Sequence, residues 1–328
     1  MAGAARSSER DPVVAMGQLL RVALFPSAIG DLLVGIAIAH RTAWPESLHP
    51  WLLIPASLGV YHGAMALNDW ADRKDDARTR PERPIPSGAI PAGLALAIAA
   101  VLVGGGLLWA GAAGPRAGLW MAVVAALAVL YDLAGRGPWL GPVLLGLCRA
   151  GNLGAGLLSP WLVGAADEPA VGLLWVAALY GTHVFFISRL GRLEDDEDDG
   201  PLDDRPTRAL RGVAITRLLI PVVGLAVLAG PTGSAPPPPL ALGLLASAAL
   251  VARGASTTLR TMREGTASPW TREAVGRATG QCLRGLPTYT GAIACLGVFL
   301  GPTCLVALTW GFAGAWLSGR LRSRFPLT

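Results

Sequence analysis

A dense group of carboxylates follows an apolar stretch near residue 70. Asn68, Asp72 and Asp76 are spaced i, i+4, i+8, so they stack on one face if the helix that begins near Trp51 continues through them. Oxygen-bearing side chains crowded at the end of an apolar span are costly unless a positive charge lies among them. A hard divalent cation suits them, and Mg²⁺ combines carboxylate oxygen with phosphate. The spacing therefore predicts a Mg²⁺ site beside a phosphorylated ligand.

A second acidic run, Glu194–Asp199, follows a later apolar stretch. Asp195 and Asp199 are spaced i, i+4, but so are Glu194 and Asp198, and both registers stay open. Six consecutive acids that stand alone are usually a solvated, self-repelling loop. Two acidic groups at the ends of two apolar stretches instead indicate a paired site, in which carboxylates from two helices hold Mg²⁺ against a diphosphate.

Basic side chains flank both acidic groups, and the planar guanidinium of arginine makes bidentate contacts with phosphate. They are Arg73, Lys74, Arg78 and Arg83 beside the first group, and Arg189 and Arg192 beside the second. We expect most of them only to set the orientation of the chain in a membrane. Because the basic residues lie between apolar runs and form no stripe, the sequence does not indicate a nucleic-acid partner.

The elements that must position these groups are membrane-spanning helices. Of 328 residues, 52% are hydrophobic and only 15% are charged, unlike a soluble domain. Apolar runs of about 17–22 residues, the length that crosses a bilayer, recur along nearly the whole chain. The apolar segments fall roughly at 19–39, 51–70, 92–112, 117–133, 140–163, 171–190, 213–230 and 238–256, and a last apolar region covers 285–319. The last region contains Gly301-Pro302, so it is one broken span or two short ones. We therefore expect an all-α polytopic bundle of nine, or ten, spans.

The distribution of charge places both acidic groups on one side of the membrane. The loops rich in basic residues are 71–91, 191–212 and 253–284. The positive-inside rule makes these loops and the amino terminus cytoplasmic. The basic carboxyl end, 320–324, then requires ten spans, whereas nine would place it outside. We expect a disordered cytoplasmic tail over 1–18, a membrane domain over 19–320 and a short basic tail over 321–328.

Two adjoining stretches are more specific than these spacings. Asn68–Asp76 matches the motif NDxxDxxxD at every fixed position, and Arg80–Gly88 matches the continuation R-P-x-R-P-[IL]-x-x-G. With these stretches the chain resembles the UbiA superfamily of intramembrane aromatic prenyltransferases, in layout over roughly residues 19–320. Asp195 and Asp199 look like the second DxxxD motif of that family, in the expected place after the sixth span.

Weaker similarities and one departure accompany these motifs. Tyr131 with Arg136 is similar to the family's tyrosine-plus-basic loop after the fourth span. Arg21, ahead of Phe25-Pro26, resembles the start of the first helix. The family usually has a lysine just before the second motif, and here Arg192 is the nearest basic residue. Extra acids also blur the second motif.

The resemblance implies an integral-membrane enzyme of the cell membrane. Mg²⁺-dependent ionisation of an isoprenyl diphosphate would deliver the prenyl group to an aromatic or other lipophilic acceptor, and the implied metal ligands are Asn68, Asp72, Asp76, Asp195 and Asp199, with Glu194 and Asp198 as the other register. The implied diphosphate contacts are Arg21, Lys74, Arg83, Arg136, Arg149 and Arg192. Tyr131 would shield or position the allylic cation, and the acceptor stays undefined.

Three polar residues lie within predicted spans: Asp31, Arg149 and Asn152. An ionised side chain at the bilayer centre costs at least about 2.5–3.5 kcal/mol on insertion scales, so these residues are functional candidates. Asp31 and Arg149 neutralise each other across the bundle, or Arg149 and Asn152 face the cavity and touch substrate. The alternative to an enzyme is a transporter or ion-binding membrane protein, which would place carboxylates well inside the spans, where only Asp31 lies.

Overall fold

A computed structural model of the chain describes residues 11–40, 44–135, 137–194, 202–228, 238–267, 269–298 and 303–326. These ranges contain helices and no strand, so the predicted all-α fold is confirmed. The α-helices are α1 (Pro12–Leu19), α2 (Phe25–Ala39), α3 (His49–Thr79), α4 (Ala92–Ala113), α5 (Pro115–Ala134), α6 (Leu140–Leu157), α7 (Ser159–Leu162), α8 (Leu174–Arg192), α9 (Arg205–Leu228), α10 (Pro238–Ala267), α11 (Arg272–Arg284), α12 (Leu286–Val298) and α13 (Thr303–Arg324). The short 3₁₀ helices η1 (Val22–Leu24) and η2 (Val171–Leu173) precede α2 and α8.

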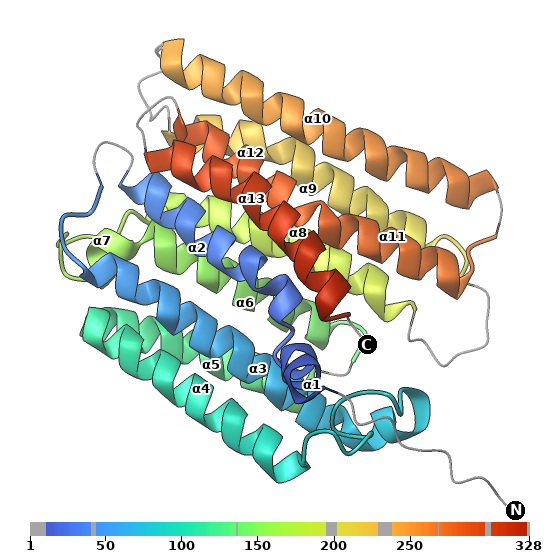
Figure 1. The fold of residues 1–328 in the computed structure, drawn as a ribbon. Helices are drawn as coiled ribbons and strands as arrows, with labels where there is room; N and C mark the ends of the chain where they lie inside the picture. The colour runs from blue at the N-terminus through green and yellow to red at the C-terminus, as the bar shows by residue number, and fades with distance from the viewer. Residues whose placement is uncertain are drawn as a thin grey trace, which may run out of the picture.

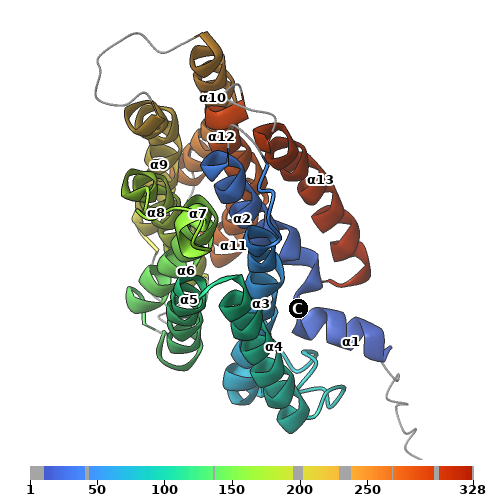
Figure 2. The same ribbon diagram turned by 90° about the vertical axis from the view of Figure 1, so that its left-hand side faces the viewer.

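Helix α2 lies at the centre of the bundle. It packs against α3 and α6 from the first half of the chain and against α12 and α13 from the second half, as the view along the helices in Figure 2 shows. Contacts between α6 and α8 join the two halves directly. Because the chain runs back and forth along the bundle, α3, α5 and α8 all finish at the same end (Figure 1).

The amino-terminal segment is more ordered than the sequence predicts. Residues 12–18, expected to belong to a disordered tail, form most of helix α1 (Pro12–Leu19). Asp11 starts this helix, since its side chain accepts a hydrogen bond from the backbone N–H of Val13, the usual role of an aspartate at a helix N-cap. Residues 1–10 of that tail lie outside the described ranges.

The last apolar region forms two helices, α12 and α13, as in the alternative that divides it into two spans. Helix α13 then continues to Arg324, into the segment predicted to be a basic tail. Gly301-Pro302, where the division was expected, falls between the two helices and outside the described ranges.

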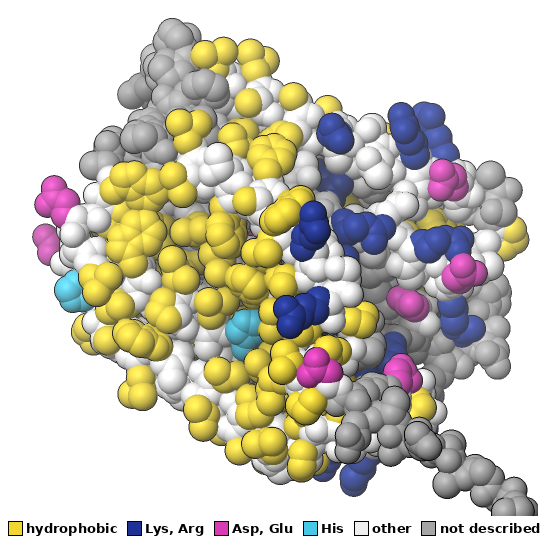
Figure 3. Space-filling view, viewed as in Figure 1, with side chains coloured by type: hydrophobic (Ala, Val, Ile, Leu, Met, Phe, Trp, Pro, Cys, Tyr) yellow, Lys and Arg dark blue, Asp and Glu magenta, His cyan; other side chains and the backbone are white. Residues whose placement is uncertain are grey.

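Five helices in the described ranges are long and apolar enough to cross a membrane: Val22–Ala39, Ala92–Ala113, Pro115–Ala134, Val171–Arg192 and Ala241–Gly265. This finding supports a membrane protein, while the number of crossings stays a prediction. On the face in Figure 3, hydrophobic side chains cover most of the bundle, and Lys and Arg gather toward the end at which α11 lies.

Glycine lets α2 and α6 approach closely. A Cβ atom on Gly35 would lie 2.5 Å from a backbone oxygen of α6, and one on Gly156 would lie 2.4 Å from a backbone oxygen of α2. Small residues at such crossings let helix backbones come together in a membrane. The close crossing also sets Asp31 of α2 beside Arg149 of α6.

Candidate functional site

The first acidic group, Asn68–Asp76, lies on α3, which runs unbroken from His49 to Thr79. Asn68, Asp72 and Asp76 therefore share one helix face, as their spacing predicts. Asp76 is buried, and Asn68 and Asp72 are half-buried. The end of α3 thus presents three oxygen-bearing side chains to the structure around it.

Arg83 is the basic residue held most firmly by this group. It follows α3 in a loop that folds back onto the helix, and its Nη1 donates to Asp76 Oδ2 at 2.7 Å. The same nitrogen lies 3.7 Å from Asp69 Oδ1. Only 6% of Arg83 is exposed, so this guanidinium is a buried charge between two carboxylates. The structure brings the predicted residue Arg83 to the first acidic group.

Arg21 reaches the same group from the other side. Its Nη2 donates to Asn68 Oδ1 at 3.1 Å and to Asp69 Oδ1 at 3.2 Å. Arg21 has φ 46°, a left-handed conformation that costs a non-glycine residue on the order of 1–3 kcal/mol. This residue turns the chain from α1 into η1. The strained turn at Arg21 therefore coincides with the contact between its guanidinium and α3.

Lys74 lies apart from the contacts that Arg21 and Arg83 make with the first acidic group. It is exposed, and two residues along a helix it lies about 200° around the axis from Asp72. Nearby, Arg78 donates to Asp75 Oδ1 at 2.8 Å on the solvent side of α3. The role predicted for Lys74 in diphosphate binding stays a prediction.

The ends of α5 and α8 meet beside the first acidic group. The guanidinium of Arg192, at the end of α8, lies 5.9 Å from the ring centroid of Tyr131 on α5. Arg192 Nη2 also donates to the backbone oxygen of Gly135 at 2.9 Å. Arg21 and Asp72 are electrostatic neighbours of Tyr131. The structure therefore joins the predicted tyrosine loop both to the first acidic group and to the helix that leads to the second.

The second acidic run lies almost wholly outside the described ranges. Asp195, Asp198 and Asp199 fall there, as does Arg136, and Glu194 is described and exposed. Their predicted roles stay predictions, and so does the register of the second motif. Among the described residues, no three His, Cys, Asp or Glu side chains are grouped so that they could hold a metal ion.

Asp132 is a residue of this region that sequence reasoning missed. It adjoins Tyr131 in the last turn of α5, and only 3% of it is exposed. Among the described residues, neither of its carboxylate oxygens makes a hydrogen bond of ordinary geometry. The Asn68 side chain lies near this carboxylate as a donor, and the charged neighbours of Asp132 are Arg21, Asp72 and Asp69. The sequence feature that could have identified Asp132 is an acid at the carboxyl end of a predicted apolar helix, where the helix dipole disfavours negative charge.

Arg149 is engaged elsewhere in the bundle. It lies 3.0 Å from Asp31 Oδ2 and donates to the hydroxyl of Tyr180 at 2.9 Å. Tyr180 in turn donates to Asp31 Oδ1 at 2.7 Å. Asn152 donates to the backbone oxygen of Ala28 at 2.8 Å. Of the two alternatives for these residues, the structure supports neutralisation of Asp31 by Arg149, and the predicted contact of Arg149 with a diphosphate stays a prediction.

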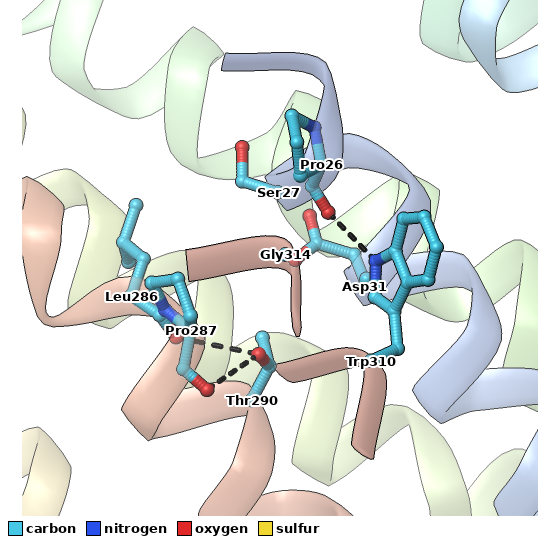
Figure 4. Close-up of a pocket in the computed structure, with 9 residues that line it drawn as sticks. Pro26, Ser27, Asp31, Leu286, Pro287, Thr290, Trp310 and Gly314 are labelled. Atoms are coloured by element: carbon cyan, nitrogen blue, oxygen red, sulfur yellow. Dashed lines mark hydrogen bonds between the residues drawn. The ribbon is translucent and has the colours of Figure 1, made fainter. Parts of the chain in front are cut away.

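Two cavities lie away from the first acidic group. One, of about 10 Å³, is bordered by Asp31, Trp310 and Thr290 and lies among α2, α12 and α13 (Figure 4). That volume suits about one water molecule. The other, of about 140 Å³, lies between α10 and α11 beside Trp270. Neither cavity contains a residue of the first acidic group.

The fold is similar to that of several solved structures. A UbiA homolog from Archaeoglobus fulgidus bound to GPP and Mg²⁺ matches with a TM-score of 0.55 and 15% identity, over 92% of this chain and 99% of that chain. A structure that concerns digeranylgeranylglyceryl phosphate synthase in membranes matches with a TM-score of 0.59 and 16% identity, over 91% and 99%. Identities this low show a shared fold alone.

Curated relatives share more sequence over shorter lengths. The bacteriochlorophyll synthase 33 kDa chain of Rhodobacter capsulatus is 32% identical over 181 residues, which are 50% of this chain and 55% of the relative. A digeranylgeranylglyceryl phosphate synthase of Methanothrix thermoacetophila is 46% identical over 67 residues, 20% and 25% of the two chains. The chain thus spans about half the length of the bacteriochlorophyll synthase chain that it matches.

A family model matches most of the chain by sequence. The model of the UbiA prenyltransferase family matches residues 24–272, which contain both acidic groups, Tyr131 and the loop of Arg83. Since this match covers more than half of the chain and agrees with the helical bundle, the chain belongs to the UbiA prenyltransferase family.

Proposed function

We propose that this protein is a membrane prenyltransferase that moves an isoprenyl group from an isoprenyl diphosphate to a lipophilic acceptor. The observation that carries the proposal is the convergence of the ends of α3, α5 and α8. It places Asn68 and Asp72 near Arg21, and Tyr131 near Arg192. Oxygen ligands for a cation and donors for a phosphate thus occur together in a member of this family.

The residues of the first acidic group fit Mg²⁺, which prefers oxygen ligands and often binds through one or two carboxylates together with phosphate. The two carboxylate oxygens of Asp132 are buried beside this group and make no hydrogen bond of ordinary geometry to the described residues, a condition that a cation would relieve. Asn68, Asp72 and Asp76 would hold Mg²⁺ from α3, and Asp195 and Asp199, which follow α8 in the sequence, would supply the other ligands. Bound there, Mg²⁺ supplies Lewis-acid neutralisation of the leaving diphosphate.

The basic residues stabilise the same charge. Arg21 and Arg192 would donate to the diphosphate oxygens as negative charge builds up on breaking the allylic C–O bond, which is electrostatic catalysis by prearranged donors. Arg83 is buried against Asp76, and it would orient that carboxylate. The ring of Tyr131 lies at the same end of the bundle. It would stabilise the allylic cation by a cation–π contact.

A transporter or ion-binding protein is less well supported. That alternative needs carboxylates available within the bundle, and the carboxylate expected there, Asp31, is paired with Arg149 at 3.0 Å. The pair removes Asp31 as a free cation ligand. The first acidic group, by contrast, lies at the end of α3.

The test uses purified protein in lipid nanodiscs and a non-ionising thiolo analogue of geranylgeranyl diphosphate. We expect Mg²⁺-dependent binding of the analogue that Asp72→Asn weakens by at least about tenfold, since even outer-shell partners of a metal contribute 10–100-fold. Asp167→Asn is the matched control, because Asp167 is exposed in the loop before η2. Isothermal titration calorimetry measures both variants.

Turnover completes the test with radiolabelled geranylgeranyl diphosphate and extracted membrane lipids as acceptors. Labelled product that needs Mg²⁺ and disappears in Asp72→Asn would support the proposal. Analogue binding that is equal with and without Mg²⁺, or equal in wild type and Asp72→Asn, would overturn it. Ion flux into vesicles without any prenyl diphosphate would favour the transporter.

A further inference from the structure

Asp132 is a buried acid with unmet bonding needs. It lies two residues before the end of α5 at Ala134, and only 3% of it is exposed. Both Oδ1 and Oδ2 are buried, and in the described part of the chain neither makes a hydrogen bond of ordinary geometry, although the Asn68 side chain lies near as a donor. An ionised carboxylate without donors is costly to bury. The carboxyl end of the helix adds an unfavourable dipole, and the last turn of α5 contains no basic residue.

The neighbours of Asp132 make a simple structural role difficult. Two of them, Asp72 and Asp69, are carboxylates that repel its charge, and Arg21 is engaged with Asn68 and Asp69. Protonation alone would not satisfy the group, because a neutral carboxyl still presents a donor and an acceptor. Asp132, together with the oxygens of Asn68 and Asp72, would hold a divalent cation, whose charge would offset this repulsion.

We infer that Asp132 is an additional oxygen ligand of the cation site, supplied by α5 opposite Asn68 and Asp72 of α3. The inference rests on the proposed function and deepens it, because it adds a ligand outside both acidic groups. Mg²⁺ takes near-octahedral coordination and keeps several waters, so three protein oxygens leave positions for water or phosphate. With ligands on both α3 and α5, the protein binds the cation before any diphosphate arrives.

The first experiment therefore uses metal alone. Purified protein in nanodiscs, without prenyl diphosphate, is titrated with Mn²⁺ as a paramagnetic substitute for Mg²⁺, and free Mn²⁺ is followed by electron paramagnetic resonance. We expect Asp132→Asn to weaken binding by at least about tenfold. Asp167→Asn, the same change at an exposed site, is expected to leave it unchanged.

Thermal stability separates a ligand from a merely structural residue. Without metal, Asp132→Asn is expected to unfold at the same temperature as wild type or higher, because it removes a repelled, unpartnered charge. Added Mg²⁺ is expected to raise the unfolding temperature of wild type through binding to the folded state, and to raise that of Asp132→Asn much less. A lower unfolding temperature of the metal-free variant would instead indicate a structural role and overturn the inference.

A second variant reports ligation directly. Soft thiolates bind soft metals, so Asp132→Cys is expected to acquire Cd²⁺ binding with a sulfur-to-cadmium charge-transfer band. The spectrum of wild type, which has four cysteines, is subtracted as background. A difference spectrum without that band, in a variant that still folds, would show that residue 132 does not reach the metal.

The outcomes distinguish this inference from the proposed function. Mn²⁺ binding that Asp72→Asn weakens and Asp132→Asn does not would overturn only the role of Asp132. Absence of Mn²⁺ binding by wild type would overturn the inference together with the metal part of the proposed function. Weaker Mn²⁺ binding in both Asp72→Asn and Asp132→Asn, with the cadmium band in Asp132→Cys, would support the inference and the proposed function.

Discussion

Arg83 is a buried charge that lies between the carboxylates of Asp69 and Asp76. Its side chain is 8% exposed and that of Asp76 is 6% exposed, and the two form an ion pair at 2.7 Å. Removing one member of a buried pair leaves the other charge uncompensated, which typically costs about 3–5 kcal/mol. We expect Arg83→Met to lower the free energy of unfolding by that amount, measured by denaturant unfolding in detergent.

The matched control is Arg78→Met. Arg78 also pairs with an aspartate of α3, at 2.8 Å, but the two side chains are 79% and 50% exposed. An exposed pair contributes about 0–1 kcal/mol. Arg78→Met is therefore expected to change the free energy of unfolding by no more than about 1 kcal/mol. Equal losses in the two variants would show that burial does not govern the strength of the Arg83 pair.

The sequence reveals which residues could form the site, and it reveals less about how they pair. Asn68, Asp72 and Asp76 could be predicted to share a face, because helical geometry fixes a spacing of four residues. The contact of Arg83 with Asp76 depends on a loop that folds back, and nothing local encodes it. The burial of Asp132 depends on the packing of α3 against α5, which no residue pattern shows.

At the scale of elements, one ion pair and its tyrosine tie three helices together. Asp31 of α2, Arg149 of α6 and Tyr180 of α8 contact one another at 2.7–3.0 Å. Asp31→Leu leaves Arg149 without its counterion, so we expect a loss of about 3–5 kcal/mol in the free energy of unfolding. Denaturant unfolding in detergent measures this loss.

The double variant Asp31→Leu with Arg149→Met sharpens that prediction. Replacing a buried pair by apolar residues of similar volume is often neutral or stabilising, so most of the loss is expected to return. A double variant as unstable as the sum of the two single variants would contradict the pairing. It would also reopen a role for Arg149 in binding substrate.

The helices themselves were predictable wherever an apolar run is long enough to cross a bilayer. Helices such as α4 and α5 agree closely with the predicted ranges 92–112 and 117–133. Helix α11 was not predicted, because Arg272–Arg284 is polar on one side and too short to span. Helix α1 was missed for a similar reason, since it lies before the first apolar run and begins at its own N-cap.

At the scale of the whole molecule, the bundle has two chemically different ends. Arg116, near the start of α5, donates to the backbone oxygen of Trp161 at 3.1 Å and so adjoins the loop 164–170. Tyr131 and Arg192 mark the other end of α5, and a helix of 20 residues is about 30 Å long. The loop 164–170 and the first acidic group therefore lie at opposite ends of the bundle.

The positive-inside rule turns this separation into a prediction of orientation. Glu168 and Arg78 are both exposed, one at each end, so Glu168→Cys and Arg78→Cys report the two sides. With a membrane-impermeant maleimide, we expect intact cells to label Glu168→Cys alone and inside-out vesicles to label Arg78→Cys alone. The parent protein, with its own four cysteines, gives the background. The reversed pattern would place the first acidic group outside, away from a cytoplasmic supply of diphosphate substrate, and would contradict the predicted orientation.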